Sequence, residues 1–287
     1  MRDILQTSLQ PSALRLLAVL ATCCLAVSAA PATAAELPDA LRVCADPHYM
    51  PFSSKDRTGF ENRIADMIGK DLGLPVQYDW FPQRMGFIRN TLRAEDPVSG
   101  RYKCDLVMGV PDDFELAITT KPYYRSTYAL VYVRGRGLDD VKSPADLAAL
   151  SRDRRDKLRI GMHERNPGVQ WLQRNDMLEQ LVPYVAQLGD PDIAPGQLEG
   201  DDLLAGKLDA AILWGPLAGY LAKRAGDTEV AVLPLQSGNG MKFDFAIAAA
   251  VRFGEKAWRD TVQASLDRHT DEIQALLREF RVPLVTN

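Results

Sequence analysis

The fold is decided by two stretches far apart in the sequence, Leu41-Arg42-Val43-Cys44-Ala45-Asp46-Pro47 and Leu208-Asp209-Ala210-Ala211-Ile212-Leu213-Trp214-Gly215-Pro216. Each is a short apolar run that enters a loop marked by proline, which is typical of a β-strand ending in a tight turn. Ligand clefts of open α/β sheets lie beyond the carboxyl ends of their strands. We therefore expect both loops to face one shared cleft, with Trp214 at its border.

The composition is that of a globular protein with a proper core. The chain has 287 residues, 46% of them hydrophobic and 25% charged, which allows one large domain or two small ones. A net charge of −4 argues against a broad nucleic-acid footprint, because such a surface needs clustered basic residues. The run Arg152–Lys157 alternates in sign and indicates a solvated loop rather than a basic patch.

Residues 1–35 have the pattern of a secretory signal peptide. Arginines precede an apolar run from Leu16 to Ala30, and small residues follow it, so we expect cleavage near Ala34-Ala35 or Ala35-Glu36. A lipoprotein cleavage site at Cys23 is the less favoured alternative, because Thr22 is a poor residue at that place. No later apolar run is long enough to span a bilayer.

Two cysteines, Cys44 and Cys104, remain after removal of the leader. An even pair in an oxidising compartment predicts a disulfide between them. Both lie at predicted strands that we expect to be neighbours in one sheet. The alternative is a pair of reduced thiols, because pairing depends on geometry that the sequence does not show.

The order of elements predicts a two-lobed α/β protein. Strands are expected at 41–45, 76–81 and 105–109, with a helix after Gly59, and a second such set between 158 and 213 is nested in the first. We expect two parallel-sheet lobes joined by a hinge, with the chain crossing near Arg134–Gly137. The boundaries are residues 36–133 and 237–287 for lobe 1 and 134–236 for lobe 2, and an amphipathic helix from Trp258 to Phe280 ends the chain.

Metal and cofactor chemistry find little support in the sequence. The three histidines, His48, His163 and His269, are far apart, and no cysteine or histidine pair has metal-ligand spacing. Hydrolase, P-loop and dinucleotide motifs are absent as well. We predict no metal and no cofactor.

The aromatic, proline-rich loops are the better candidates for a site. Small-molecule sites combine aromatic walls with a few polar groups, and arginines can hold a carboxylate. The alternative is that residues such as Phe52 and Tyr123 only pack the lobes together. The expected cleft residues, for ligand or partner contact, are Asp46, His48, Tyr49, Phe52, Glu61, Arg84, Tyr123, Tyr124, Arg125 and Trp214.

The chain resembles the family-3 solute-binding proteins of ABC transporters from Leu37 to Leu284. The motifs that carry the resemblance, in order, are Leu41-Arg42-Val43, Pro51-Phe52, Gly59-Phe60-Glu61, Cys104-Asp105-Leu106-Val107, Lys121-Pro122-Tyr123-Tyr124 and Gly206-Lys207-Leu208-Asp209-Ala210. The resemblance implies the type II periplasmic binding protein fold. Amino-acid receptors of that family hold the ligand carboxylate with an arginine and its ammonium with acidic residues. Here Asp113 and Trp214 stand near those positions, so a receptor for free amino acids is not expected.

A narrower resemblance accounts for these departures. The stretches Cys44–Pro47, Trp80–Arg84 with Gly86–Leu92, Val107–Pro111, Thr120–Tyr128 and Trp214–Tyr220 are similar to the MxaJ/XoxJ type of binding proteins, which accompany PQQ-dependent methanol dehydrogenases. This resemblance implies a periplasmic protein of methanol oxidation that has a quinoprotein alcohol dehydrogenase as its partner and helps its maturation or activation.

Two other hypotheses stay open. One is an ABC receptor for a small organic solute that is not a standard amino acid. The other is an enzyme on the same scaffold, as cyclohexadienyl dehydratases are, which would place a titratable group with a shifted pKa in the cleft. Nothing in the sequence distinguishes Glu61, Asp46 or His48 in that way, and we expect no enzyme.

Overall fold

The computed structural model describes residues 37–286 except for 186–189, 191 and 194–195. The signal peptide expected at residues 1–35 and its cleavage site lie outside the described residues. Within the described part of the chain, no helix combines the length and the apolar character needed to cross a membrane.

The first sheet is built around three parallel strands, β1 (Leu41–Ala45), β4 (Val76–Trp80) and β5 (Leu106–Pro111). β1 lies between the other two, as expected for a β-α-β unit whose helix crosses over the sheet. The late strand β12 (Asp244–Val251) then pairs antiparallel with β5. The first lobe is therefore completed by a segment from near the end of the chain.

The second sheet contains the parallel strands β8 (Ile160–His163), β9 (Leu181–Tyr184) and β10 (Ala210–Trp214). β11 (Val230–Pro234) lies antiparallel to β7 (Tyr124–Val133) in the same sheet. Both sheets are thus mixed rather than purely parallel, because β11 and β12 pair antiparallel with their neighbours. A sequence pattern predicts where such strands lie but not their direction.

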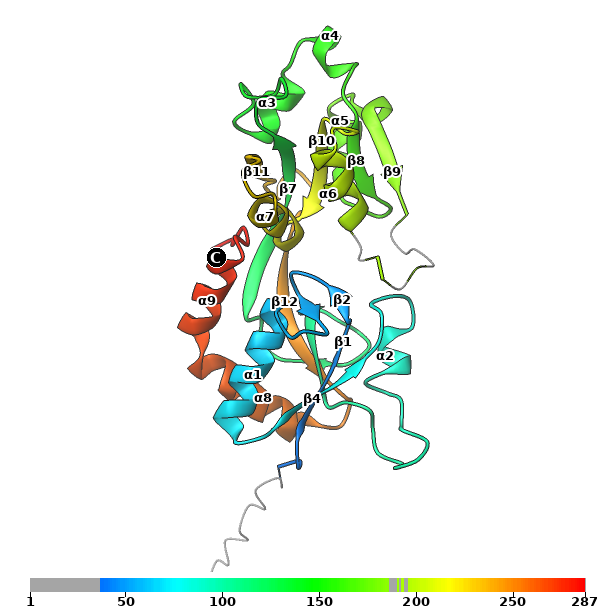
Figure 1. Ribbon diagram of the computed structural model, residues 1–287, viewed down its shortest axis with the longest axis vertical. Helices are drawn as coiled ribbons and strands as arrows, with labels where there is room; N and C mark the ends of the chain where they lie inside the picture. The colour runs from blue at the N-terminus through cyan, green and yellow to red at the C-terminus, as the bar shows by residue number, and fades with distance from the viewer. Residues whose placement is uncertain (1–36, 186–189, 191, 194–195, 287) are drawn as a thin grey trace, which may run out of the picture. The chain divides into compact units, whose positions relative to one another are not determined.

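Strand β7 belongs to both sheets (Figure 1). Residues 124–127 pair with β12, whereas residues 128–131 pair with β10 and residues 129–133 with β11. The expected crossing at Arg134–Gly137 is wrong, since the chain passes between the sheets within β7. A ten-residue strand is long enough to exchange its partners along its length.

Helices flank the two sheets. α1 (Phe60–Leu72) ends at Gly73, whose φ of 68° is the left-handed conformation that favours glycine. α3 (Pro144–Ala148) begins after Ser143, whose side chain accepts from the Asp146 N–H and caps the helix, and Pro144 occupies its first turn. The expected terminal helix is two helices, α8 (Lys256–Arg268) and α9 (Thr270–Glu279), because the chain leaves helical geometry at His269.

The remaining elements are short. They are β2 (His48–Tyr49), β3 (Ser53–Ser54), α2 (Phe87–Asn90), β6 (Ile118–Thr119), α4 (Arg152–Arg155), α5 (Gly168–Arg174), η1 (Leu178–Gln180), α6 (Gln197–Leu204) and α7 (Gly215–Arg224). Each sheet packs its helices over a core of its own.

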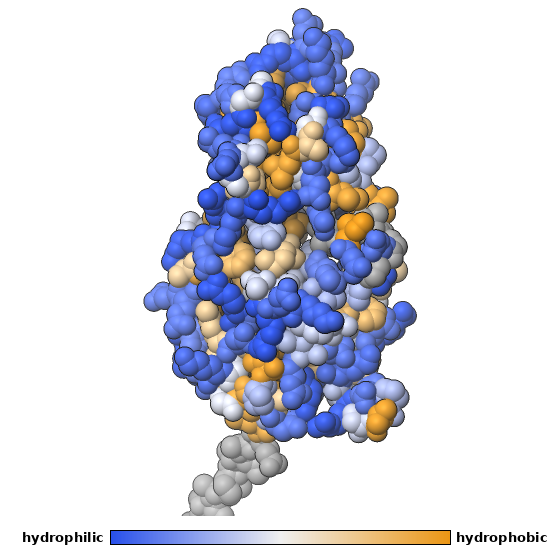
Figure 2. All heavy atoms as spheres, in the orientation of Figure 1, coloured by the Kyte–Doolittle hydropathy of each residue, from blue (hydrophilic) through white to orange (hydrophobic). Residues whose placement is uncertain are grey.

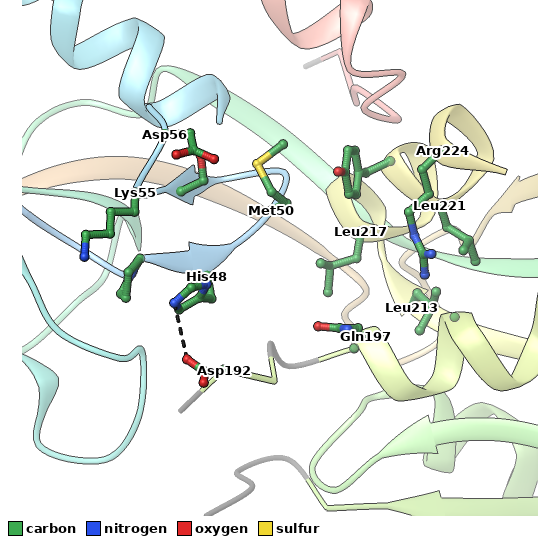
Figure 3. A pocket seen from close by; sticks show the side chains of 15 residues that line it. His48, Met50, Lys55, Asp56, Asp192, Gln197, Leu213, Leu217, Leu221 and Arg224 are labelled. Carbon is green, nitrogen blue, oxygen red and sulfur yellow. Dashed lines mark ion pairs between the residues drawn. The ribbon is translucent and has the colours of Figure 1, made fainter. Parts of the chain in front are cut away.

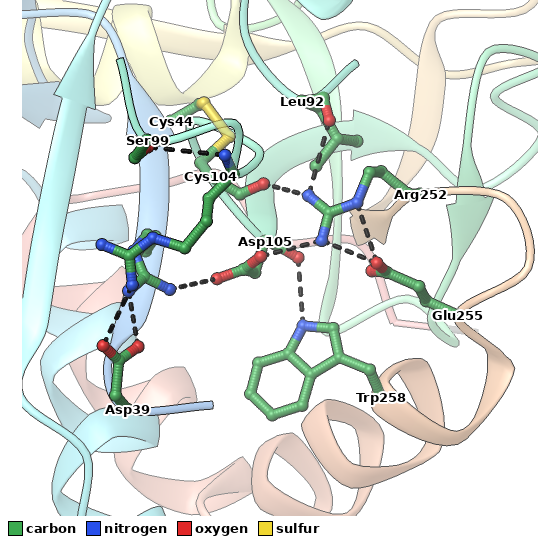
Figure 4. A network of polar contacts seen from close by, with 11 residues as sticks. Asp39, Cys44, Leu92, Ser99, Cys104, Asp105, Arg252, Glu255 and Trp258 are labelled. Atoms are coloured by element: carbon green, nitrogen blue, oxygen red, sulfur yellow. Dashed lines mark hydrogen bonds and ion pairs between the residues drawn. A yellow bond between two sulfur atoms is a disulfide. The ribbon is translucent and has the colours of Figure 1, made fainter. Parts of the chain in front are cut away.

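A buried arginine ties the late part of the chain to the first sheet (Figure 4). Arg252, which follows β12, donates to the Cys104 carbonyl and forms ion pairs with Asp105 at 2.8 Å and Glu255 at 2.7 Å. Trp258 of α8 donates to the Asp105 carbonyl at 3.0 Å. The charge of the buried guanidinium is thereby paired, as burial requires.

The disulfide expected from the sequence is present beside this network (Figure 4). Cys44 and Cys104 are joined with their Cα atoms 5.5 Å apart. Cys44 lies in β1 and Cys104 lies two residues before β5, so the bond ties β1 to the start of its neighbouring strand.

The disulfide yields the first prediction. The protein without its leader, denatured without reductant, should contain no titratable thiol. The double variant Cys44→Ser/Cys104→Ser should lose about 2 to 4 kcal/mol of unfolding free energy in urea denaturation, because the bond restricts the unfolded chain. Two thiols in the unreduced protein, or an unchanged unfolding free energy, would contradict it.

Candidate functional site

An inner cavity of about 100 Å³ lies where the ends of β1, β5 and β10 meet α1. Its wall comes mostly from the first lobe, with Trp214 as the contribution of the second. The described residues that line it are Cys44, Ala45, Asp46, Tyr49, Phe52, Ser53, Glu61, Gln83, Phe87, Val107, Met108, Gly109, Tyr124, Trp214 and Ile247. None of them carries a positive charge.

Glu61 is the most perturbed acid of the inner cavity. It stands in the first turn of α1 and is buried, and desolvation raises the pKa of its carboxyl to about 8. The Tyr123 hydroxyl donates to its Oε1 at 3.5 Å, which opposes this shift in pKa without cancelling it. Gly109, with a φ of +71°, leaves the space that Glu61 occupies, because a Cβ there would lie 2.3 Å from Oε1.

Tyrosines surround this carboxyl. Burial first, and then the charge of Glu61, raise the pKa values of Tyr49, Tyr123 and Tyr124 above the usual range. The Tyr123 hydroxyl accepts from the Gly109 N–H at 3.2 Å. The Tyr124 hydroxyl is buried and has no hydrogen-bond partner among the described residues. An orphaned buried hydroxyl is costly, so it is a feature that needs an explanation.

Aromatic rings form much of the remaining cavity wall. The Phe52 ring lies 4.6 Å from that of Tyr49 and 5.3 Å from that of Phe60, and these separations suit tilted aromatic pairs. On the opposite side, the Trp214 ring lies 5.3 Å from Tyr128 and 6.0 Å from Phe245. Trp214 therefore both packs the lobes together and borders the cavity.

Asp46 shapes the loop after β1. Its Oδ1 accepts from the His48 N–H at 2.8 Å and its Oδ2 from the Gln83 N–H at 2.5 Å, while its carbonyl accepts from the Ser53 hydroxyl at 2.7 Å. Its carboxyl is thus already occupied by the backbone. The signal for this role was present in the sequence, because aspartate before proline is common where a turn begins.

An outer cavity of about 470 Å³ lies between the two lobes (Figure 3). The first lobe contributes the loop at β2 and β3, and the second contributes α6, β10 and α7. His48 Nε2 lies 3.3 Å from the Asp192 carboxylate across this space. Its described lining residues are Pro47, His48, Met50, Ser54, Lys55, Asp56, Asp192, Gly196, Gln197, Gly200, Leu213, Leu217, Tyr220, Leu221 and Arg224.

The outer cavity is lined by both polar and apolar residues, and the surface view shows the same mixture (Figure 2). The face shown in Figure 2 is mostly hydrophilic, with hydrophobic side chains exposed around a hollow near its middle. The residues from α7 were missed by the sequence reasoning, although the motif Trp214–Tyr220 already marked this helix as unusual.

The expected cleft residues separate into three groups. The inner cavity brings together Asp46, Tyr49, Phe52, Glu61, Tyr124 and Trp214. Tyr123 is not among its lining residues but donates a hydrogen bond to Glu61. His48 lines the outer cavity instead. Arg84 and Arg125 line neither of these two cavities, and Arg125 forms an ion pair with Asp244 at 2.6 Å. A role in contact for any of these residues stays a prediction.

Comparison with known proteins gives a consistent result. No protein-family model matches the chain. Protein MoxJ of Methylorubrum extorquens is 29% identical over 88% of this chain and 85% of that protein. The crystal structure of the periplasmic binding protein XoxJ from Methylobacterium extorquens AM1 is 33% identical, covers 86% of this chain and 100% of its own, and superposes with a TM-score of 0.67.

A second solved structure shares the fold. It is that of MxaJ from Methlophaga aminisulfidivorans MPT, with 24% identity, coverage of 85% of this chain and 100% of its own, and a TM-score of 0.65. The bilobed binding-protein fold expected from the sequence is therefore confirmed.

The buried Glu61 yields a prediction on pH. Its pKa is raised from 4.5 to about 8 in the folded protein, so the folded state binds more protons than the unfolded state in this window. The contribution of this group to the unfolding free energy should fall by on the order of 1 kcal/mol per pH unit from about pH 4.5 to 8. It should not change with pH below or above this range. Glu61→Gln should flatten this decline in urea denaturation series.

The exposed Glu179 of η1 supplies the matched control. Glu179→Gln should keep the decline of the unfolding free energy with pH that is seen in the natural protein. The substitution only replaces an exposed, solvated carboxyl by a solvated amide. A Glu61→Gln variant whose stability declines with pH as steeply as that of the control would contradict the assignment.

The charge of the inner cavity yields a prediction on amino acids. A bound zwitterion would meet two acidic side chains and no positive charge there, at a cost of several kcal/mol for its unpaired carboxylate. Millimolar glycine, glutamate or arginine should leave the melting temperature where sodium chloride of equal ionic strength leaves it, since a ligand of the native state must stabilise that state. A rise of several degrees with any of the three would show the prediction to be wrong.

Proposed function

This chain belongs to the MxaJ/XoxJ type of periplasmic binding proteins, and from that premise we propose that it is a periplasmic accessory protein of a PQQ-dependent methanol dehydrogenase. Its role is to assist the maturation or activation of that enzyme rather than to deliver a solute to a permease. The partner is therefore a protein, and the binding protein itself supplies contacts, not catalysis.

The observation that carries this proposal is that aromatic and apolar side chains stand where an amino-acid receptor has the charged side chains that hold its ligand. Trp214 occupies the end of β10, where an amino-acid receptor presents a carboxylate, and it is only partly buried. Next to it, α7 directs Leu217 and Tyr220 into the outer cavity. Aromatic anchors in partly enclosed sites dominate the energetics of protein interfaces.

Charged groups at the edge of the outer cavity complement these anchors. Lys55 of the first lobe and Arg224 of the second line the same space, and Arg224 is held at 2.5 Å from Asp201. Apolar anchors inside a polar border are the arrangement of a specific protein interface. This supports a protein partner that reaches both lobes.

A solute receptor is the second candidate. The volume of the outer cavity, about 470 Å³, falls in the range of small-molecule sites. Under this alternative, the protein delivers a small organic solute, other than a standard amino acid, to an ABC transporter. We do not propose an enzyme, because Glu61, the acid with the large shift in pKa, accepts a hydrogen bond from Tyr123, and the carboxyl of Asp46, the other acid of the wall, is occupied by backbone N–H groups.

The proposal predicts activation of an inactive dehydrogenase. Addition of the protein without its leader should raise PQQ-dependent methanol oxidation by an incompletely active partner. Trp214→Ala and Tyr220→Ala should each raise the protein concentration needed for half-maximal activation by about fivefold or more. Loss of an interface anchor worth over about 1 kcal/mol has an effect of this size. Lys256→Ala, at the start of α8, is the control and should change activation less than about twofold.

Melting curves for each variant separate contact from packing. Because Trp214 packs on Tyr128 and Phe245, and Tyr220 packs against the core of the first lobe, both alanine variants are expected to lower the melting temperature, so activation is compared at a temperature where each variant is fully folded. Absence of both activation and binding at micromolar concentrations would favour the solute receptor instead.

A further inference from the structure

The inner cavity has an acidic group with unused bonding capacity. Of its two acidic side chains, Asp46 already accepts two backbone N–H groups, at 2.8 and 2.5 Å. Glu61 receives one side-chain hydrogen bond among the described residues, from Tyr123 at the long distance of 3.5 Å. No lysine, arginine or histidine is among the described lining residues. The cavity therefore offers a carboxylate site without a counter-charge.

A second, independent feature of the same cavity also lacks a partner. Tyr124 is 4% exposed and lines the cavity, yet its hydroxyl has no hydrogen-bond partner among the described residues. A hydroxyl oxygen can accept a hydrogen bond as well as donate one. The charge of Glu61 raises the pKa of Tyr124, so the two groups lie within electrostatic range of each other. A donor bound between them would satisfy both.

We infer that the inner cavity binds a small organic monocation of the short alkylammonium class. The ammonium group donates to the Glu61 carboxylate and to the Tyr124 hydroxyl oxygen. The alkyl group packs against the rings of Tyr49, Phe52 and Trp214, whose π-faces attract a cation. This inference goes beyond the proposed function and does not depend on it.

The volume of the cavity limits the size of the ligand. About 100 Å³ is less than the roughly 150 Å³ of a cavity that holds benzene. Methylammonium fits this limit, and dimethylammonium or ethylammonium are close to it. A larger organic cation requires the lobes to separate, and a zwitterion brings a carboxylate against two acidic side chains.

Binding of the cation is coupled to release of a proton. Burial raises the pKa of Glu61 to about 8. The titratable groups around it are Tyr123 just before β7, Tyr124 at the start of β7 and Tyr49 of β2, and Asp46 lines the same cavity. A cation binds the ionised carboxylate, so below pH 8 each binding event must expel the proton. Affinity rises by about tenfold per pH unit up to pH 8 and levels off above it.

Isothermal titration calorimetry tests the inference on the protein without its leader. Methylammonium chloride is titrated at pH 6.5 and 8.5, beside sodium chloride and methanol as the inorganic and the neutral probes. The dissociation constant for methylammonium should be about 20-fold lower at pH 8.5. At pH 6.5, titration in two buffers of different protonation enthalpy should show close to one proton released per ligand.

Three variants locate the site. Glu61→Gln should weaken methylammonium binding at pH 8.5 by more than about tenfold and remove its pH dependence. Tyr124→Phe should weaken it by about three- to tenfold and leave the melting temperature unchanged or higher, because the orphaned hydroxyl is gone. Glu179→Gln should bind as the natural protein does.

Several results would overturn the inference. They are methanol binding as tightly as methylammonium, sodium binding equally well, no heat of binding at millimolar ligand, and unchanged affinity in Tyr124→Phe. If Glu61→Gln fails to fold, the proton release of the natural protein decides the question, because a neutral ligand or a surface site releases no proton at pH 6.5.

Discussion

The residues of β7 need hydrogen-bond partners along both edges of a ten-residue strand, and the chain supplies them from two different sheets. Its first four residues pair with β12 and its last six with β10 and β11, so the backbone hydrogen bonds of one strand hold both lobes. A buried strand cannot leave these groups unpaired without cost. The relative position of β1, whose loop carries Asp46 and Tyr49, and β10, which ends in Trp214, therefore depends on the register of β7. The inner cavity exists because that register brings the ends of these two strands together.

Within this frame, the polar centre of the inner cavity depends on a missing side chain. Gly109 has no Cβ and takes a left-handed conformation, and the Glu61 carboxyl fills the space beside it. The site thus has an acid whose pKa is raised to about 8 by burial, next to a tyrosine hydroxyl without a partner. Both features cost stability, and a binding function gives a reason for a protein to keep them. The same aromatic wall that lowers the polarity around Glu61 also forms part of the contact between the lobes, so binding and packing share residues such as Trp214.

Much of this arrangement was predictable from local sequence patterns. The strand at Leu41–Ala45 and the helix after Gly59 have clear periodicity and caps, and two lone cysteines in a secreted chain predicted the disulfide. The rule that ligand clefts lie beyond strand ends pointed to the segment after β1, and its Asp46, Tyr49 and Phe52 do line the inner cavity. Arg125 lines neither of the two cavities, because side chains alternate along a strand: Tyr124 lines the inner cavity, and the next side chain faces away and forms an ion pair with Asp244. The crossing between sheets and the contribution of α7 depend on long-range pairing that no local pattern contains.

The place of β12 in the sheet has a consequence for the order in which the lobes can form. Every strand of the second sheet lies between residues 124 and 234, whereas the first sheet needs residues 244–251 to connect β5 to β7. A chain that leaves a translocation channel amino-terminus first has the second lobe complete while the first still waits for its fourth strand. Such pairing across more than a hundred residues raises the contact order and slows folding. The disulfide lies entirely in the early part, so it can hold β1 against β5 throughout that delay.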